Sequence, residues 1–281
     1  MQNKNSLLYW YKKIKNLDIP QPETRIILLN FNDIDRFWDT IAGNYTSMNP
    51  LSNSLLEKIY YIANELGYPL FFRTDMSSYK HNWENATLIQ NKEHIRGCIT
   101  QTIEFHMCYG LLGLPFNALV FRKYIPLQST FTAFRGKLPI AKERRYFINK
   151  GQIQCHHPYW SIESIDFPNI KDWREKLIEL NKETEKEIKH LSDYALKVAK
   201  IFDGNWSIDF ALSKEGIWYL IDMALGGDSY HHIECQYCSE EMRKFYLKRI
   251  EERKRRRHIL EQFRNNKKEN EKLKRGSKKW D

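Results

Sequence analysis

Apolar residues recur at every third or fourth position in several stretches of the chain, which is the spacing of an amphipathic helix. One stretch runs from Ser52 to Leu66, with a polar residue at its start and Gly67 directly after it as a stop signal. Helices are therefore expected over residues 6–16, 52–66, 91–110 and 172–201, the last as one long amphipathic helix.

Strands are predicted where short aliphatic and aromatic runs lie between turn-forming residues. These runs cover residues 25–31, 69–73, 118–125, 130–135, 144–149, 152–155, 206–212 and 217–223. The order of elements predicts an α+β fold with a largely antiparallel central sheet. We expect an N-terminal α/β subdomain over residues 1–117, a strand-rich subdomain over 118–240 and a basic helical tail over 241–281.

Two of the predicted strands form a hairpin and carry one aspartate each. If Glu215 and Gly216 make a two-residue turn, Asp209 lies directly opposite Asp222 on one face of the hairpin. A four-residue loop keeps both carboxylates on that face, whereas a three-residue loop does not. The other face is then an apolar core face, made of Ile208, Phe210, Ile221 and Met223.

Two carboxylates this close repel each other unless a cation neutralises them. Oxygen ligands of this kind suit Mg²⁺ that is bound together with substrate phosphates. The alternative is that Asp209 and Asp222 each pair with a neighbouring lysine or arginine, or point to water.

Basic side chains are predicted beside two other strands. Arg73 ends an apolar strand, and Lys80 follows it after two serines, a combination that can hold phosphate. In the segment 142–148, alternation places Glu143 and Arg145 on one face. Cations for phosphate, an apolar strand for a base and acids for magnesium together describe a nucleotide site.

Charge is distributed unevenly along the 281 residues, whose formal net charge is +10. Residues 241–281 hold 17 basic and 7 acidic side chains, so the rest of the chain is neutral. The tail is either a solvated helix or an electrostatic contact for nucleic acid or another acidic partner. No stretch reaches the roughly 18 apolar residues of a membrane span. The five cysteines, an odd number, do not suggest a disulfide framework, so we expect a cytoplasmic protein.

Five segments between residues 71 and 223 stand in a characteristic order: FFRTDMSSYK (71–80), LVFRKYIPL (119–127), KERRYFINKGQI (142–153), WSIDFAL (206–212) and WYLIDM (218–223). In this order they resemble the ATP-grasp superfamily. The likeness is to the clade named for an arginine and two lysines, and to the related cell-division-cycle protein that assembles eukaryotic translation initiation factor two.

The resemblance implies ATP sandwiched between two α+β subdomains, with Mg²⁺ as the metal. It assigns Lys80 and Arg145 to the phosphates as catalytic residues, with Arg73 behind Lys80, and it assigns Asp209 and Asp222 to the metal. The strand at 119–125 matches the hinge whose backbone contacts adenine, at Val120, Phe121, Arg122 and Lys123.

The implied activity is that of an ATP-dependent carboxylate–amine ligase, which acts on a small-molecule or peptide carboxylate and an amine through an acyl phosphate. The usual final element of the family is an acid, any residue and an asparagine, whereas here Met223 and Ala224 follow Asp222. Asp228 is the candidate replacement for this third ligand. The departure favours an alternative, a non-catalytic ATP-binding assembly factor. A third hypothesis is an ATP-binding protein associated with nucleic acid through its tail.

Histidines and cysteines follow the second aspartate strand. Their spacing suits zinc, with a further ligand from residues 155–157, or the two histidines face the acceptor substrate instead; the residues are His231, His232, Cys235 and Cys238. The aromatic pairs at 159–160 and 218–219 are expected in the core.

Overall fold

The computed structural model describes residues 3–41, 50–110 and 115–252, together with residues 255, 259 and 262. The chain divides into two units, Met1–Tyr230 and His231–Asp281. The first unit contains two four-stranded sheets, with strand orders β1-β4-β2-β3 and β10-β9-β7-β8, and the separate pair β5-β6. Every strand pair in the described residues is antiparallel, which confirms the predicted α+β class.

The strands of the first unit are listed here in chain order: β1 (Thr24–Leu28), β2 (Leu70–Thr74), β3 (Leu88–Ile89), β4 (Ala118–Lys123), β5 (Ser129–Ala133), β6 (Leu138–Ala141), β7 (Glu143–Asn149), β8 (Gln152–Pro158), β9 (Trp206–Leu212) and β10 (Trp218–Leu225). Its helices are α1 (Leu7–Ile14), α2 (Phe31–Ile41), α3 (Asn53–Leu66), α4 (His94–Gly110), α5 (Trp173–Asn181) and α6 (Glu185–Ala199). Short helical segments are η1 (Lys80–Asn82), η2 (Trp83–Thr87), η3 (Ile162–Ser164) and η4 (Gly226–Asp228).

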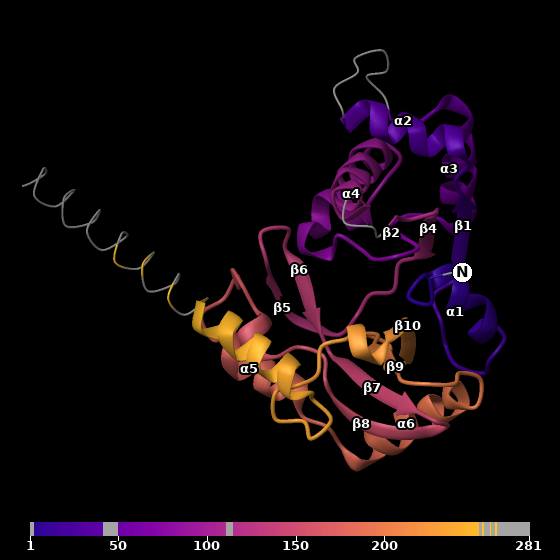
Figure 1. Cartoon of the computed structure of the whole chain (residues 1–281). Helices are drawn as coiled ribbons and strands as arrows, with labels where there is room; N and C mark the ends of the chain where they lie inside the picture. Colours follow the sequence, from indigo (N-terminus) through magenta and orange to yellow (C-terminus); the bar gives the residue numbers. More distant parts are fainter. Residues whose placement is uncertain are drawn as a thin grey trace, which may run out of the picture. The chain divides into compact units, whose positions relative to one another are not determined.

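Helices α3 and α4 pack with the first sheet (Figure 1). Helix α3 begins where the sequence predicts, because the Ser52 side chain accepts a hydrogen bond from the Leu55 amide at 3.2 Å. It ends at Gly67, whose φ of 76° disfavours any residue with a Cβ atom. The core formed here includes Ile59 of α3, Ile99 of α4 and Phe72 of β2.

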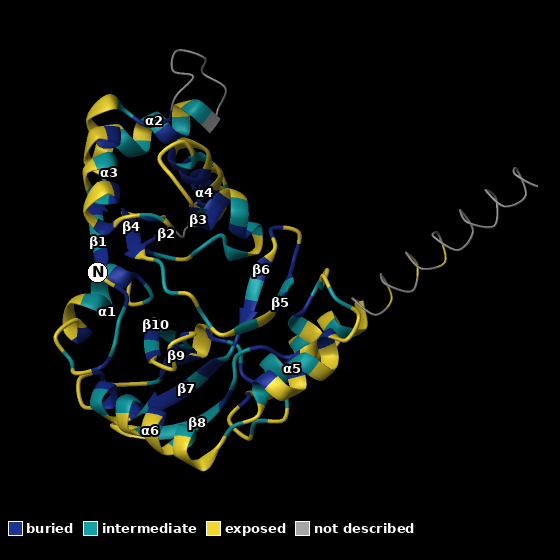
Figure 2. Ribbon diagram, turned by 180° about the vertical axis from the view of Figure 1, so that it is seen from behind, coloured by how far each residue is buried: buried dark blue, intermediate teal, exposed yellow. Residues whose placement is uncertain are grey.

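A second core lies against the second sheet. Helix α1 contributes Trp10, helix α6 contributes Leu191 and Val198, and strand β9 contributes Ile208 and Phe210. Figure 2 shows exposed residues along the outer sides of α3 and α6 and buried residues on the strands they cover. Helices α3 and α6 therefore turn their apolar faces to the two sheets and their polar faces to solvent, as the amphipathic pattern predicts.

The region expected to form one helix over 172–201 is two helices, so that prediction is wrong. The Thr184 side chain accepts a hydrogen bond from the Glu187 amide at 3.2 Å and caps the start of α6. Arg144, which is fully buried on β7, donates to the carbonyls of Leu180 and Lys182 at 3.3 and 2.8 Å. A buried cation from a distant strand thus binds the C-terminal end of α5.

Two further elements differ from expectation. The strand at 25–31 ends at Leu28, because the Asn30 side chain accepts a hydrogen bond from the Asp33 amide at 2.9 Å and starts α2. Strand β6 was not predicted. It pairs with β5, although it contains Pro139, because β5-β6 is a two-stranded sheet in which every strand is an edge strand.

The hairpin of β9 and β10 brings the two aspartates together by an unexpected route. The Ser213 amide donates to the Ile217 carbonyl at 2.9 Å, so three residues form the loop rather than two. A register shift between Leu220 and Asp222 then makes Ile221 an extra residue, and Asp222 pairs with Asp209 after all. Leu220 takes the place in the core that was expected for Ile221.

The second unit consists of turns followed by a helix over residues 240–252. Arg243 donates to the carbonyls of Cys235 and Cys238 at 3.2 and 3.4 Å, which ties the helix to the preceding turns. Phe245 and Leu247 are exposed. Most of the predicted basic tail beyond residue 252 lies outside the described residues. None of the helices in the described part of the chain is long and apolar enough to span a bilayer.

We predict that Arg144→Ala lowers the free energy of unfolding by about 3–5 kcal/mol, because it leaves Glu183 and Glu187 without the cation that lies 3.4 and 3.0 Å away. Urea denaturation measures the change. Arg96→Ala, an exposed change on α4, is the control and should shift stability by less than about 0.5 kcal/mol. Equal effects of the two changes would contradict a structural role for the buried cation.

Candidate functional site

A pocket in the first unit is bordered by β2 and η1, by the segment that follows β4, and by the aspartate hairpin. Its walls combine an apolar part with seven charged side chains: Arg73, Lys80, Arg122, Lys123, Glu143, Asp209 and Asp222. This composition suits a ligand with a flat apolar group and a polyanionic group.

Each aspartate of the hairpin is paired with an arginine. Arg145 binds Asp209 with two parallel hydrogen bonds of 2.7 Å each, from Nε and from a terminal nitrogen. A terminal nitrogen of Arg73 lies 2.8 Å from Oδ1 of Asp222. The structure therefore shows the alternative considered for the two aspartates, in which each of them pairs with a basic side chain. The Met223 amide also donates to Oδ1 of Asp222, at 3.0 Å.

Within these pairs, each charged side chain stabilises the opposite charge of its partner. Burial opposes ionisation of Asp222, but the guanidinium groups of Arg73 and Arg122 outweigh it and lower the pKa of Asp222 below its usual value. Burial likewise disfavours the charge of Arg145, yet Asp209 raises the pKa of Arg145 above its usual value. Asp222 and Arg145 are thus ionised at neutral pH.

Lys80 points toward two aromatic rings. Its Nζ donates to the Tyr159 hydroxyl at 2.7 Å and lies 4.3 Å from the centre of the Tyr159 ring and 4.9 Å from that of Trp160. Burial works against the ammonium charge, but Tyr159, Glu143 and Asp209 outweigh that cost and raise the pKa of Lys80. Lys80 therefore presents a permanent positive charge in the pocket.

Arg122 is a second cation of the first sheet. Its side chain is almost fully buried and donates to the Ile221 carbonyl at 2.5 Å. Burial and the neighbouring charge of Arg73 lower the pKa of Arg122 to about 10. The carbonyl that Arg122 binds belongs to the extra residue of β10, so the register shift in that strand also anchors the first sheet to the hairpin.

Glu143 is a buried carboxyl at the pocket wall, and its Oε1 accepts a hydrogen bond from Nε1 of Trp160 at 3.0 Å. Burial raises the pKa of Glu143 to about 7, even though Lys80 and the hydrogen bond from Trp160 favour its charged form. Glu143 therefore changes its charge near neutral pH, unlike Asp222.

Several residues assigned from the sequence lie away from the pocket wall. Val120 and Phe121 are fully buried in the two cores, and their strand pairs with β1 on one side and β2 on the other. Of the predicted hinge, Arg122 and Lys123 line the pocket, followed by Tyr124 and Ile125. Asp228 is exposed, and its Oδ2 accepts a hydrogen bond from Asn5 at 2.7 Å.

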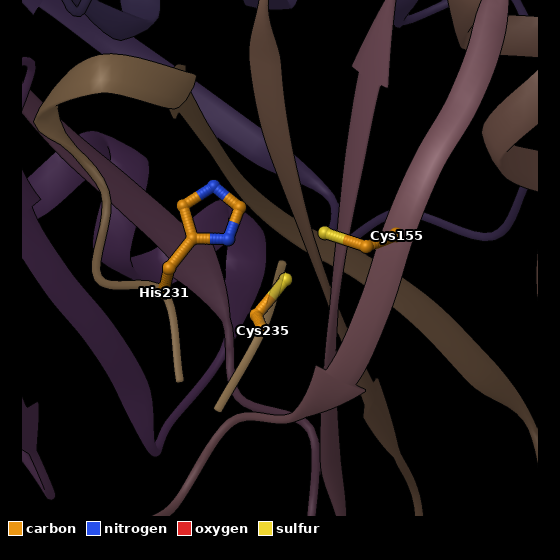
Figure 3. Close-up of side chains that lie close together, drawn as sticks. All are labelled: Cys155, His231 and Cys235. Carbon is orange, nitrogen blue, oxygen red and sulfur yellow. The ribbon is translucent and has the colours of Figure 1, made fainter. Parts of the chain in front are cut away.

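His231 and His232 belong to the second unit, whereas the pocket lies in the first. The residues of the zinc hypothesis are likewise divided between the units: Figure 3 shows Cys155 on strand β8 of the first unit, and His231 and Cys235 on the segment that follows Tyr230. The zinc hypothesis and the substrate hypothesis for these histidines stay predictions.

Sequence reasoning missed three side chains of the pocket. Trp160 is buried in a third core with Tyr159 packed against it, as predicted, and both rings also line the pocket beside Lys80. Glu143 was placed on the correct strand face but given no role. The signal that was available is the alternation of β7, which puts Glu143 and Arg145 on the same side. Trp218 of the other aromatic pair is buried in the second core, as predicted.

A family model of ATP-grasp domains, the third family of the clade named for an arginine and two lysines, matches residues 63–235. The chain belongs to this family.

Two structures of Cdc123 from Schizosaccharomyces pombe share 16% identity, with 80% of this chain and 86% of theirs covered. The C-terminally truncated form has a TM-score of 0.52 and the other a TM-score of 0.49. D-alanine–D-alanine ligase from Bacillus anthracis in complex with ATP has a TM-score of 0.40 and 13% identity, over 79% of this chain and 55% of that one. No curated protein matches the sequence.

Membership of this ATP-grasp clade confirms the resemblance drawn from the five sequence segments and the ATP-grasp fold. The matched range contains every charged residue that lines the pocket. It also contains the departure at Met223 and Ala224. Ala224 pairs with Ser207 of β9 within the regular ladder of the hairpin, so a methyl group stands where the family pattern has an amide.

We predict that Glu143 makes the protein less stable as the pH rises. A buried carboxyl whose pKa is raised from 4.5 to about 7 binds more protons in the folded state. The free energy of unfolding of the wild type should thus fall between about pH 5 and pH 8 relative to Glu143→Gln, by about 3 kcal/mol at most. Urea denaturation at several pH values measures this difference. Parallel profiles of the two proteins would contradict the raised pKa.

Proposed function

We propose that this chain binds ATP with Mg²⁺ in the pocket and joins a carboxylate to an amine. The observation that supports the proposal is that Asp209 and Asp222 lie opposite each other in one pocket of an ATP-grasp domain together with two cations, Arg73 and Lys80. Arg145 does not line the pocket itself but binds Asp209. In such a reaction the carboxylate attacks the γ-phosphorus and ADP leaves; the amine then attacks the acyl carbon, loses a proton and displaces phosphate.

The residues present suit the polyphosphate of ATP. Lys80 lines the pocket, and Arg145 binds the pocket residue Asp209. Neither needs to act as a nucleophile, because phosphoryl transfer depends on positioning and charge neutralisation. The apolar part of the wall, with Phe71, Trp83 and Tyr124, suits the base. The hinge contact with adenine is then made by residues 123–125 at the end of β4 rather than by the buried Val120 and Phe121.

The residues present also suit Mg²⁺. Carboxylate oxygens are its preferred protein ligands, and Asp209 and Asp222 lie opposite each other on the hairpin and both line the pocket. Magnesium, when bound, neutralises the phosphate charge. Asp209 and Asp222 would hold the metal, and Arg145 and Arg73 would then be available to phosphate oxygens. The first unit thus holds the required charges in place before any ligand arrives.

The experiment is calorimetric titration of the protein with ATP at several magnesium concentrations. We predict that magnesium strengthens ATP binding of the wild type at least about tenfold, and that Asp209→Asn and Asp222→Asn each remove most of this effect. Asp193→Asn, an exposed change on α6, is the matched control. Wild-type metal dependence in both pocket variants, with folding verified by circular dichroism, would contradict the assignment of the aspartates.

A non-catalytic assembly factor is the second candidate function. The alanine at position 224, where the family pattern has asparagine, favours it, because one metal ligand is absent from its usual place. ADP release that requires both a carboxylate and an amine, small-molecule or peptide, supports the ligase. ATP that stays bound and intact with every such pair supports the assembly factor.

The basic tail supports a nucleic-acid or other acidic partner for residues 241–281, which hold 17 basic and 7 acidic side chains. We predict that the affinity for a random duplex DNA falls at least about tenfold between roughly 50 and 200 mM salt, because bound counterions are released. A chain truncated after Arg253 should lose most of this affinity and keep ATP binding. A gel-shift titration at both salt concentrations measures the DNA affinity of the two proteins. Equal DNA affinity of the two proteins, or an affinity that does not change with salt, would contradict an electrostatic role of the tail and favour a solubilising helix.

A further inference from the structure

The turn between β5 and β6, residues 134–137, packs against the segment that carries Lys80. The amide of Gly136 donates to the His81 carbonyl at 3.2 Å, and the amide of Glu84 donates to the Gly136 carbonyl at 3.1 Å. These two hydrogen bonds fix the backbone directly after Lys80, at η1 and at the start of η2. The pocket charge is thus supported from a part of the chain about fifty residues further on.

Gly136 fits this contact because it has no side chain. A Cβ atom at this position would lie 2.4 Å from the Cα of Asn82, 2.4 Å from the amide nitrogen of Trp83 and 2.6 Å from the carbonyl carbon of Asn82. All three are backbone atoms, which cannot rotate away as the end of a flexible side chain can. Any larger residue must therefore push the segment 82–83 away from the turn.

Side chains on either side of Gly136 reinforce the contact. The Phe134 ring stacks on His81 at 4.0 Å and lies 6.1 Å from Trp160, the ring that faces Lys80. On the other side, Lys137 pairs with Glu84 at 2.9 Å. Phe134 and Lys137 both have positive φ values, of 61° and 57°. Residues other than glycine rarely adopt such values, so contacts of this kind must hold the turn in its conformation.

We propose that the turn at residues 134–137 is a positioning element for Lys80, with Gly136 as its essential contact. It fixes η1 so that the ammonium of Lys80 points at Tyr159 and Trp160 inside the pocket. Gly136 itself does not line the pocket, so it acts on the ligand only through Lys80. The inference rests on the proposed function of Lys80 as a phosphate ligand.

The first test compares Gly136→Ala with Lys80→Ala and with Gly97→Ala, a glycine of α4 around which no atom would contact a Cβ. Calorimetry with ATP and with adenosine separates phosphate binding from base binding. We expect Gly136→Ala to lower ATP affinity by at least about tenfold, as Lys80→Ala does, and to change adenosine affinity by less than about twofold. Gly97→Ala should change neither.

Two results would overturn the proposal: a folded Gly136→Ala variant that keeps wild-type ATP affinity, or one that loses ATP and adenosine affinity equally. If this variant does not fold, charge-reversal variants of the Lys137–Glu84 pair test the contact instead. Glu84→Lys places two cations together and should speed hydrogen exchange of the backbone amide at position 84, and adding Lys137→Glu should restore the slow rate. Unchanged exchange in Glu84→Lys, or no restoration in the double variant, would also overturn it.

Failure of the proposed function is recognised separately. If the wild type binds no ATP, the assignment of Lys80 to phosphate is wrong, whatever the turn does. Hydrogen exchange over residues 82–88 then tests the turn alone. Faster exchange in Gly136→Ala than in Gly97→Ala supports a turn that holds this segment, and equal exchange contradicts it.

Discussion

The extra residue in β10 is the constraint on which the pocket depends. With a three-residue hairpin loop and a regular ladder, Asp222 would face the apolar core, where an ionised carboxylate without a partner is very costly. The register shift at Ile221 turns Asp222 to the side of Asp209 and gives the core Leu220 instead. The same shift presents the Ile221 carbonyl to Arg122. One inserted residue therefore sets both the acidic pair and the contact between the two sheets.

Charge balance in the pocket follows from that arrangement. Arg73 comes from β2 of the first sheet and Arg145 from β7 of the second, and each neutralises one aspartate of the hairpin. Neither sheet alone holds both cations and both acids. Under the proposed function, both ion pairs would have to open, so that the aspartates would be available to magnesium and the arginines to phosphate.

Distant residues position the groups that face the pocket. Arg144 points to the opposite side of β7 from Arg145 and binds the end of α5 together with Glu187 at the start of α6. Gly136 supports the backbone beside Lys80 in a comparable way. In both cases a single buried contact fixes a segment far away in sequence, because a polar group or a close backbone approach tolerates few alternatives.

The sequence by itself determined much of the α+β class, the helix from Ser52 to Gly67, the family and the identity of the charged residues, because periodicity, caps and motif order are local properties. It placed Asp209 opposite Asp222, although through a turn that the chain does not make. Only the tertiary structure decided the loop length and the extra residue at Ile221, the break between α5 and α6, and the position of Tyr159 and Trp160 at the pocket wall. Each of these depends on a partner from a distant strand or turn, such as Arg122 or Arg144, and no pattern along the chain records which segments meet in space.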